Sequence, residues 1–141
     1  MKNAIKEAKK SKQDIPIGCV IKQNGKIIAS THNMREELDD ITAHAEILAI
    51  KEAQKKLKSS RLNECEMFVT LEPCPMCGWA ILQSGIKTLY FGAYNPQYGS
   101  MCSNPNIDLI KISGSKIKVY GGIMEEECKN LLDSFFKEIR K

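Results

Sequence analysis

The sequence lacks any long apolar run. Its 141 residues contain no stretch of about 18 consecutive apolar residues, the length that a membrane-spanning helix needs. The first ten residues, MKNAIKEAKK, carry charges but no apolar segment of the kind found in a secretory signal. These absences argue against a membrane-spanning or secreted protein, and we expect a cytoplasmic one.

Histidine and aromatic residues are also scarce, at two histidines and 6% aromatic residues. No internal repeat, low-complexity tract or linker divides the chain, so we expect a single domain over residues 1–141. The net charge of +4 slightly favours an anionic partner. Solvated helix faces are nevertheless the ordinary explanation for the basic residues near the two ends.

The apolar pattern predicts strands that alternate with helices after an initial helix and hairpin. An Asn-Gly pair, Asn24–Gly25, follows the β-branched run Ile15–Ile21 and predicts a hairpin turn. The later predicted elements are a helix with Thr42 as its N-cap, a strand at Glu66–Leu71, a helix from Pro75 that ends at Gly85, strands at Ile86–Ala93 and Lys116–Gly122, and a final helix carrying Met124 to Ile139. This order predicts an α/β fold in three layers, a mixed five-stranded sheet with helices on both faces.

The segment Tyr94–Asp108 is polar and too long for a plain connection, so we expect it to be functional.

A second unusual segment is LEPCPMCGWA, which places Cys74 and Cys77 at a predicted strand-to-helix junction. A thioredoxin-type redox pair and a metal site would both fit such a junction, and the pair alone leaves both possibilities open. A helix N-terminus favours the thiolate, which is the form that binds zinc.

His44, Ala45 and Glu46 form the other motif, near the start of the predicted helix from Thr42. A catalytic zinc site uses three protein ligands and a water, so His44 is the natural third ligand beside the cysteine pair. Residues two apart on a helix point about 200° away from each other, so we expect Glu46 to carry protons rather than bind the metal. His-x-Glu combined with Pro-Cys-x-x-Cys is the signature of zinc-dependent base deaminases.

On these residues the chain resembles the cytidine-deaminase-like superfamily, and most closely the bacterial tRNA adenosine deaminases of the TadA type. The matching segments are DIPIGCVI, THN, TAHAEI, VTLEPCPMC, FGA and GIMEEECKNLLDSFFKEIR, which together span nearly the whole chain. The resemblance implies one zinc ion per subunit on His44, Cys74 and Cys77, proton transfer by Glu46, and a homodimer. It implies a hydrolase that deaminates adenosine to inosine at the wobble position of the tRNA anticodon and releases ammonia.

The resemblance also implies substrate contacts. Asn33 and the backbone N–H of Ala45 would hydrogen-bond the target base. Phe135 and Phe136 match aromatic residues near the RNA-binding surface, although helix packing is the ordinary role for at least one of them. Asn95 stands where the family usually has an aspartate near the nucleic-acid backbone, and asparagine lacks its charge. We therefore expect looser discrimination between RNA and DNA.

Two alternatives remain open at this point. A zinc-dependent deaminase of a free nucleobase or nucleoside, of the guanine or cytosine type, would carry the same zinc motifs. The phenylalanine pair and the basic residues of the final helix favour RNA. The second alternative is a structural zinc domain, or a subunit that binds RNA without catalysis. A structural site would have a fourth protein ligand, for which the candidates are Cys19, Cys65, Cys102 and Cys128. The presence of Glu46 argues against lost catalysis.

Overall fold

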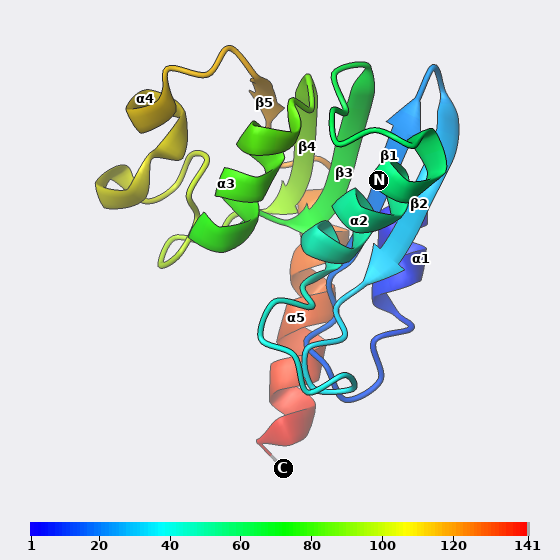
Figure 1. Ribbon diagram of the computed structural model, residues 1–141. Coiled ribbons are helices and arrows are strands. Elements are labelled where there is room, and N and C mark those ends of the chain that lie inside the picture. The colour runs from blue at the N-terminus through cyan, green and yellow to red at the C-terminus, as the bar shows by residue number, and fades with distance from the viewer. Residues whose placement is uncertain (141) are drawn as a thin grey trace.

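The computed structural model describes residues 1–140 and contains a five-stranded sheet with helices on both faces (Figure 1). The strands are β1 (Gly18–Gln23), β2 (Lys26–His32), β3 (Cys65–Leu71), β4 (Thr88–Ala93) and β5 (Lys118–Tyr120). The helices are α1 (Lys2–Ala8), α2 (Ala45–Leu57), α3 (Pro75–Ser84), α4 (Leu109–Ser113) and α5 (Glu125–Ile139), with a 3₁₀ turn at Pro105–Ile107. Within this described part, no helix is both long and apolar enough to cross a membrane. The predicted fold class is confirmed.

The order of strands in the sheet brings two distant loops together. The order is β2-β1-β3-β4-β5, in which β1 is antiparallel to β2 and β3, whereas β3, β4 and β5 are parallel. The carboxyl ends of parallel strands meet at one edge of a sheet, where α/β proteins usually bind ligands. The loop after β3, which leads to Cys74, therefore lies beside the loop that follows β4.

Helices α2 and α3 cover one face of the sheet, and α1 and α5 cover the other (Figure 1). Alternate residues of β3, namely Cys65, Met67 and Val69, are fully buried in the larger core cluster. This two-residue period is what a strand with one face against a helix layer requires. The core therefore fixes the starts of α2 and α3 relative to the ends of the strands.

Local turn chemistry explains why several elements begin and end where they do. Asn24 and Gly25 both have positive φ, 51° and 77°, as a tight hairpin turn between β1 and β2 requires. Helix α3 has Cys74 as its N-cap and Pro75 in its first turn, and Gly85 ends it with a φ of 82°. The hairpin and both ends of α3 are confirmed.

The prediction that Thr42 caps α2 is wrong. The N-cap is His44, with an extended backbone at φ −73° and ψ 151°. Thr42 instead donates its backbone N–H and its hydroxyl to Asp40 Oδ1, at 2.8 and 2.7 Å. This local turn competes with capping, as short polar side chains often do. The helix therefore starts later and leaves His44 outside it.

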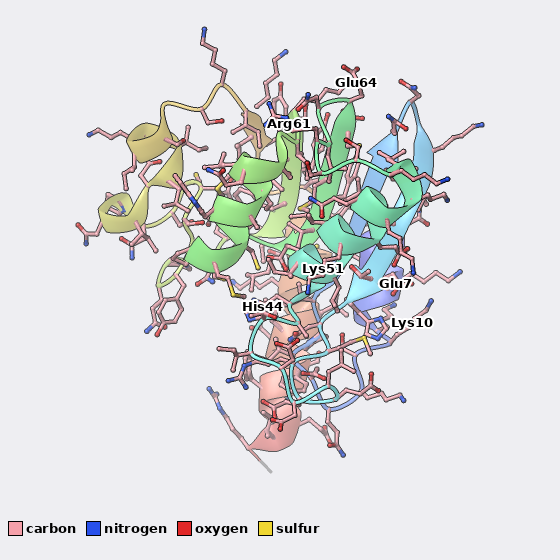
Figure 2. The ribbon with its side chains drawn as sticks, in the orientation of Figure 1. Glu7, Lys10, His44, Lys51, Arg61 and Glu64 are labelled. Carbon is pink, nitrogen blue, oxygen red and sulfur yellow. The ribbon has the colours of Figure 1, made fainter. Side chains whose placement is uncertain are left out.

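A small polar cluster joins α1 to the end of β2. The carboxylate of Glu7 accepts a hydrogen bond from Lys10 Nζ at 2.8 Å and lies 3.0 Å from His32 Nδ1. Figure 2 shows Glu7 and Lys10 close together beside α1. Glu7 is largely buried, so these partners offset the cost of removing its charge from water.

Candidate metal and catalytic site

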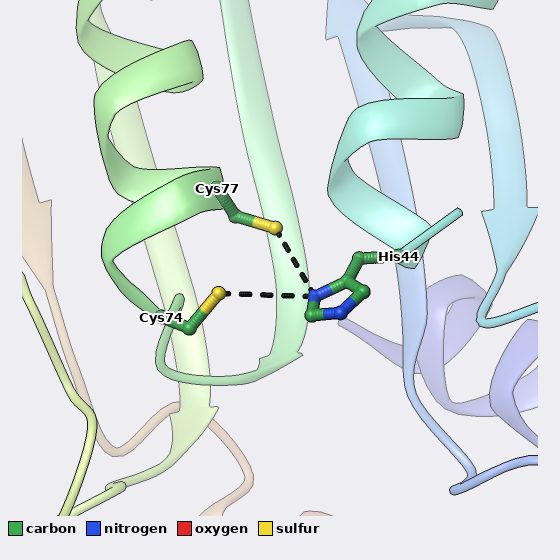
Figure 3. Close-up of side chains that lie close together, drawn as sticks. All are labelled: His44, Cys74 and Cys77. Carbon is green, nitrogen blue, oxygen red and sulfur yellow. Dashed lines mark hydrogen bonds between the residues drawn. The ribbon is translucent and has the colours of Figure 1, made fainter. Parts of the chain in front are cut away.

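Three side chains from two helix starts converge at the carboxyl edge of the sheet (Figure 3). Nδ1 of His44 lies 3.7 Å from Sγ of Cys74 and 3.5 Å from Sγ of Cys77. His44 is the N-cap of α2, Cys74 is the N-cap of α3, and Cys77 lies in the first turn of α3. The three ligand atoms all lie within 4.8 Å of one another. The structure thus brings the predicted metal ligands together.

The geometry of this group fits zinc. Zinc bonds of about 2.3 Å to sulfur and about 2.05 Å to nitrogen, in a tetrahedron, put neighbouring sulfur and nitrogen ligands about 3.6 Å apart. The two observed separations of 3.7 and 3.5 Å bracket that value. Within residues 1–140 the group contains three ligands and none of the other four cysteines. That leaves the fourth position open, as in a catalytic site.

The electrostatics of the cysteine pair favour a bound cation. A hydrogen bond from Cys77 lowers the pKa of Cys74 to about 4, and the contact with His44 adds to this effect. The same pairing with Cys74, together with burial, raises the pKa of Cys77. One thiolate is therefore ready at neutral pH, and the second thiol needs a cation to release its proton.

Glu46 lies beside these ligands, where its carboxyl interacts with the thiol of Cys77. It is 4% exposed, and its Oε1 has no hydrogen-bond partner among the described residues. Burial raises its pKa to about 7; the charge of Cys74 also raises this pKa, whereas the charge of His44 lowers it. Because His44 lies at the N-cap rather than within α2, the helical spacing used in the sequence argument does not relate the two side chains.

A buried carboxyl group with an unpaired oxygen is rare in a folded protein and often marks a functional site. A pKa near 7 suits a group that must both accept and donate a proton at neutral pH. Glu46 can therefore act as general acid and base toward a molecule bound beside the three ligands.

Two of the expected base contacts lie next to this group in the fold. Asn33 follows β2 and is 6% exposed; its Nδ2 donates to Ile15 O at 3.2 Å, and its Oδ1 accepts from Arg35 N at 3.3 Å. Ala45 is the first residue of α2, and its carbonyl accepts a hydrogen bond from Thr31 Oγ1 at 2.7 Å. The N–H of a first helical residue has no acceptor within the helix, so it is free to meet a ligand.

Asn95 and Phe136 line one cavity of about 630 Å³, whose wall includes Tyr94 and Tyr98. This cavity lies between the loop after β4 and helix α5. Phe135 makes an edge-to-face contact with Phe136 at 5.4 Å between ring centroids. Phe135 is not among the residues that line the cavity, so it supports its neighbour rather than the wall.

One residue that the sequence did not reveal shapes the loop that carries Cys74. Ser100 is fully buried, and its Oγ donates to the carbonyls of Pro73 and Cys74, at 2.9 and 3.1 Å. Gly78 leaves room for this hydroxyl, since a Cβ there would lie 2.3 Å from it. The only sequence signal was the unusual length of the Tyr94–Asp108 segment.

Comparison with known proteins agrees with this geometry. The family model of MafB19-like deaminases matches residues 1–140. The tRNA-specific adenosine deaminase of Bacillus subtilis is 45% identical, over 100% of this chain and 89% of its own length. The tRNA-specific adenosine deaminase of Aquifex aeolicus is 42% identical, over 99% of this chain and 93% of its own.

A solved structure from work on A-to-I editing by tRNA:A34 deaminases at the wobble position superimposes with a TM-score of 0.85. It is 36% identical, and the match covers 94% of this chain and 97% of the other. The full-length matches and the shared fold show the family of the chain. The chain belongs to the tRNA-specific adenosine deaminase family of the cytidine-deaminase-like superfamily.

Proposed function

We propose that the chain is a zinc-dependent tRNA adenosine deaminase, which converts adenosine to inosine at the wobble position of the anticodon. The observation that carries the proposal is the open group of His44, Cys74 and Cys77 with the buried carboxyl of Glu46 beside it, one of whose oxygens has no partner among the described residues. Relatives named for this activity match the chain over its full length. A structural zinc domain has no need for such a carboxyl group and uses a fourth protein ligand.

In this proposal His44, Cys74 and Cys77 hold one zinc ion in each subunit. When bound, zinc acts as a Lewis acid that lowers the pKa of water toward neutrality. Glu46 takes a proton from the attacking water, whose oxygen adds to C6 of adenine. Glu46 then gives this proton to the ring nitrogen next to C6. It next takes the second proton of the same water oxygen and passes it to the leaving amine. Ammonia departs, the ring becomes hypoxanthine, and the sum is adenosine plus water giving inosine plus ammonia.

The remaining residues of the proposal bind the nucleotide. Asn33 and the N–H of Ala45 orient the base, which must leave the stacked bases of the anticodon loop to reach Glu46 and the three ligands. Asn95 and Phe136 contact the RNA around it, with Phe135 packed behind Phe136. The net charge of +4 supports binding to an RNA polyanion. A homodimer formed by this single domain, acting in the cytoplasm where tRNA is used, completes the proposal.

A substrate panel distinguishes this function from deamination of free bases. The zinc-loaded protein is incubated separately with adenine, guanine, cytosine, their nucleosides and an anticodon stem-loop that carries adenosine at the wobble position. Ammonia release from the stem-loop alone is the expected result. Turnover of guanine or cytosine without turnover of the stem-loop would instead establish the free-base alternative.

A further inference from the structure

A second buried carboxylate lies two residues before the ligand Cys74. Glu72 follows β3 directly and is 1% exposed. Among the ion pairs of residues 1–140, none involves Glu72. A buried charge without a cation must be compensated by hydrogen bonds, because its transfer from water is otherwise very costly.

Among residues 1–140, the hydrogen-bond donors to this carboxylate come from residues 95–103, the segment that we call the 95–103 loop. Its Oε1 accepts the backbone N–H of Asn95 at 3.1 Å and the hydroxyl of Ser103, and its Oε2 accepts the backbone N–H of Ser103 at 2.8 Å. Gly99 packs directly against it, since a Cβ on Gly99 would lie 2.4 Å from Glu72 Oε1. The loop is therefore folded around the carboxylate.

This arrangement makes the loop and the carboxylate depend on each other. Without the loop, Glu72 would be a buried charge with none of these donors. Without the carboxylate, two backbone N–H groups and one hydroxyl of the loop, all partly buried, would lose their acceptor, and the loss of an acceptor costs more where water reaches the donor less easily. Hydrogen bonds to a charged acceptor are also stronger than neutral ones.

The same loop has two contacts that matter for the proposed reaction. Asn95 and Tyr98 form part of the wall of the 630 Å³ cavity, opposite Phe136. Ser100 bonds to the carbonyl of the ligand Cys74. Glu72 therefore determines where the cavity wall lies relative to the metal ligands, although it contacts neither the metal group nor the cavity itself.

We propose that Glu72 is a positioning residue that holds the 95–103 loop as an RNA-binding wall beside the metal group. The choice of RNA as the ligand rests on the proposed function, whereas the folding of the loop around Glu72 does not. Amide hydrogen exchange of the protein without RNA tests the folding alone. Glu72→Gln puts an NH₂ group against a donor, so exchange at Asn95 and Ser103 becomes at least about tenfold faster.

Glu66→Gln is the matched control, because Glu66 lies near the other end of the same strand, is half-buried and accepts a hydrogen bond from Tyr90 Oη at 3.4 Å, outside the 95–103 loop. Exchange in the 95–103 loop stays at the wild-type rate in this control. Equal exchange rates in the loop of wild type and Glu72→Gln would overturn the proposal.

Kinetics on the anticodon stem-loop test the positioning role. Glu72→Gln raises KM by about tenfold, in line with the loss of a charged hydrogen bond, while kcat stays within about twofold and zinc content is unchanged. Loss of kcat with an unchanged KM would overturn the role.

If Glu72→Gln does not fold, Ser103→Ala decides: a smaller rise in KM supports the role, and an unchanged KM overturns it. A wild-type protein that leaves the stem-loop untouched refutes the proposed function instead, and the exchange comparison still decides on Glu72.

Discussion

The two buried glutamates near the metal group differ in what their carboxylates contact. Glu72 has donors for both of its oxygens, whereas Oε1 of Glu46 has none among the described residues. A saturated carboxylate stabilises the loop that supplies its donors, and an unsaturated one keeps a free site for a ligand. In the roles that we propose, the same residue type thus serves structure in one position and chemistry in the other.

Asn95 offers a test of how charge near the RNA backbone affects discrimination. Its Oδ1 accepts the N–H of Tyr98 at 3.1 Å, and an aspartate would keep that bond, so Asn95→Asp changes chiefly the charge. We expect the ratio of deamination rates on matched RNA and DNA hairpins to be higher for Asn95→Asp than for wild type. Equal ratios for the two proteins would refute this expectation.

Glu7 gives a prediction about pH. Burial alone would raise the pKa of Glu7, but hydrogen bonds from Lys10 and His32 outweigh it and lower the pKa. A carboxyl whose pKa is lower in the folded state contributes stability that is present above its unfolded pKa of about 4.3 and is lost as the pH falls through the folded pKa.

We therefore expect the difference in free energy of unfolding between wild type and Glu7→Gln to shrink as the pH falls from about 7 to about 3. Urea unfolding curves of both proteins give this difference. Both proteins carry the same His44, Cys74 and Cys77 group, so the pH dependence of that group cancels in the difference. A difference that stays constant over the whole range would show that the Glu7 contacts do not lower its pKa.

At the scale of single residues, the sequence predicted which three ligand side chains come together but not the residues that support them. His44, Cys74 and Cys77 share a spacing that chemistry requires, so the pattern identified them before the fold was known. Glu72 and Ser100 could not be found this way, because their partners are backbone groups more than twenty residues away. Such partners leave no periodicity in the sequence.

The ends of the elements are what place the site. His44 and Cys74 are both N-caps, so the ligands lie where helix dipoles are positive and thiolates are favoured. The boundaries predicted correctly are those marked by Asn24–Gly25, Pro75 and Gly85. Each of these residues has a strong backbone preference of its own, and the fold agrees with it. The Thr42 cap and the short helix α4 were not predicted correctly, because Asp40 competes for Thr42 and a five-residue helix has too little periodicity.

The hairpin turn between β1 and β2 gives a prediction about stability. Gly25 has a φ of 77°, and a Cβ there would touch nothing within 4 Å, so an alanine meets only backbone strain. We expect Gly25→Ala to lower the free energy of unfolding by about 1–2 kcal/mol. Urea unfolding measures this loss, with Lys26→Ala as the neighbouring control. Turnover per folded molecule stays at the wild-type value, and a wild-type free energy of unfolding would contradict the turn assignment.

On the scale of the whole molecule, the mixed sheet joins the site to the rest of the fold. The parallel pair β3 and β4 brings the Cys74 loop beside the 95–103 loop, and the end of the hairpin, where Asn33 follows β2, lies beside the start of α2. The alternation of strands and helices in the sequence predicted these layers. It did not predict the order of the strands, which depends on contacts between distant residues.

Removal of the metal tests how much the site contributes to the whole molecule. A ligand present at about 100 times its Kd stabilises the folded state by about 2.7 kcal/mol. We therefore expect dialysis against a chelator to abolish turnover and to lower the Tm by several degrees, in proportion to that stabilisation. Zinc restores both, whereas magnesium restores neither, because a site of one nitrogen and two sulfurs suits zinc. Recovery with magnesium would contradict the ligand assignment.

The most direct test of the account is inosine formation in an anticodon stem-loop that carries adenosine at the wobble position. Mass spectrometry of the RNA after incubation with zinc-loaded wild type and Glu46→Gln gives the measurement, with zinc content determined for both proteins. The account predicts inosine at that one position with wild type, and a rate about 10²–10⁴-fold lower with Glu46→Gln at equal zinc content. Equal rates for the two proteins, or no inosine with wild type, would contradict it.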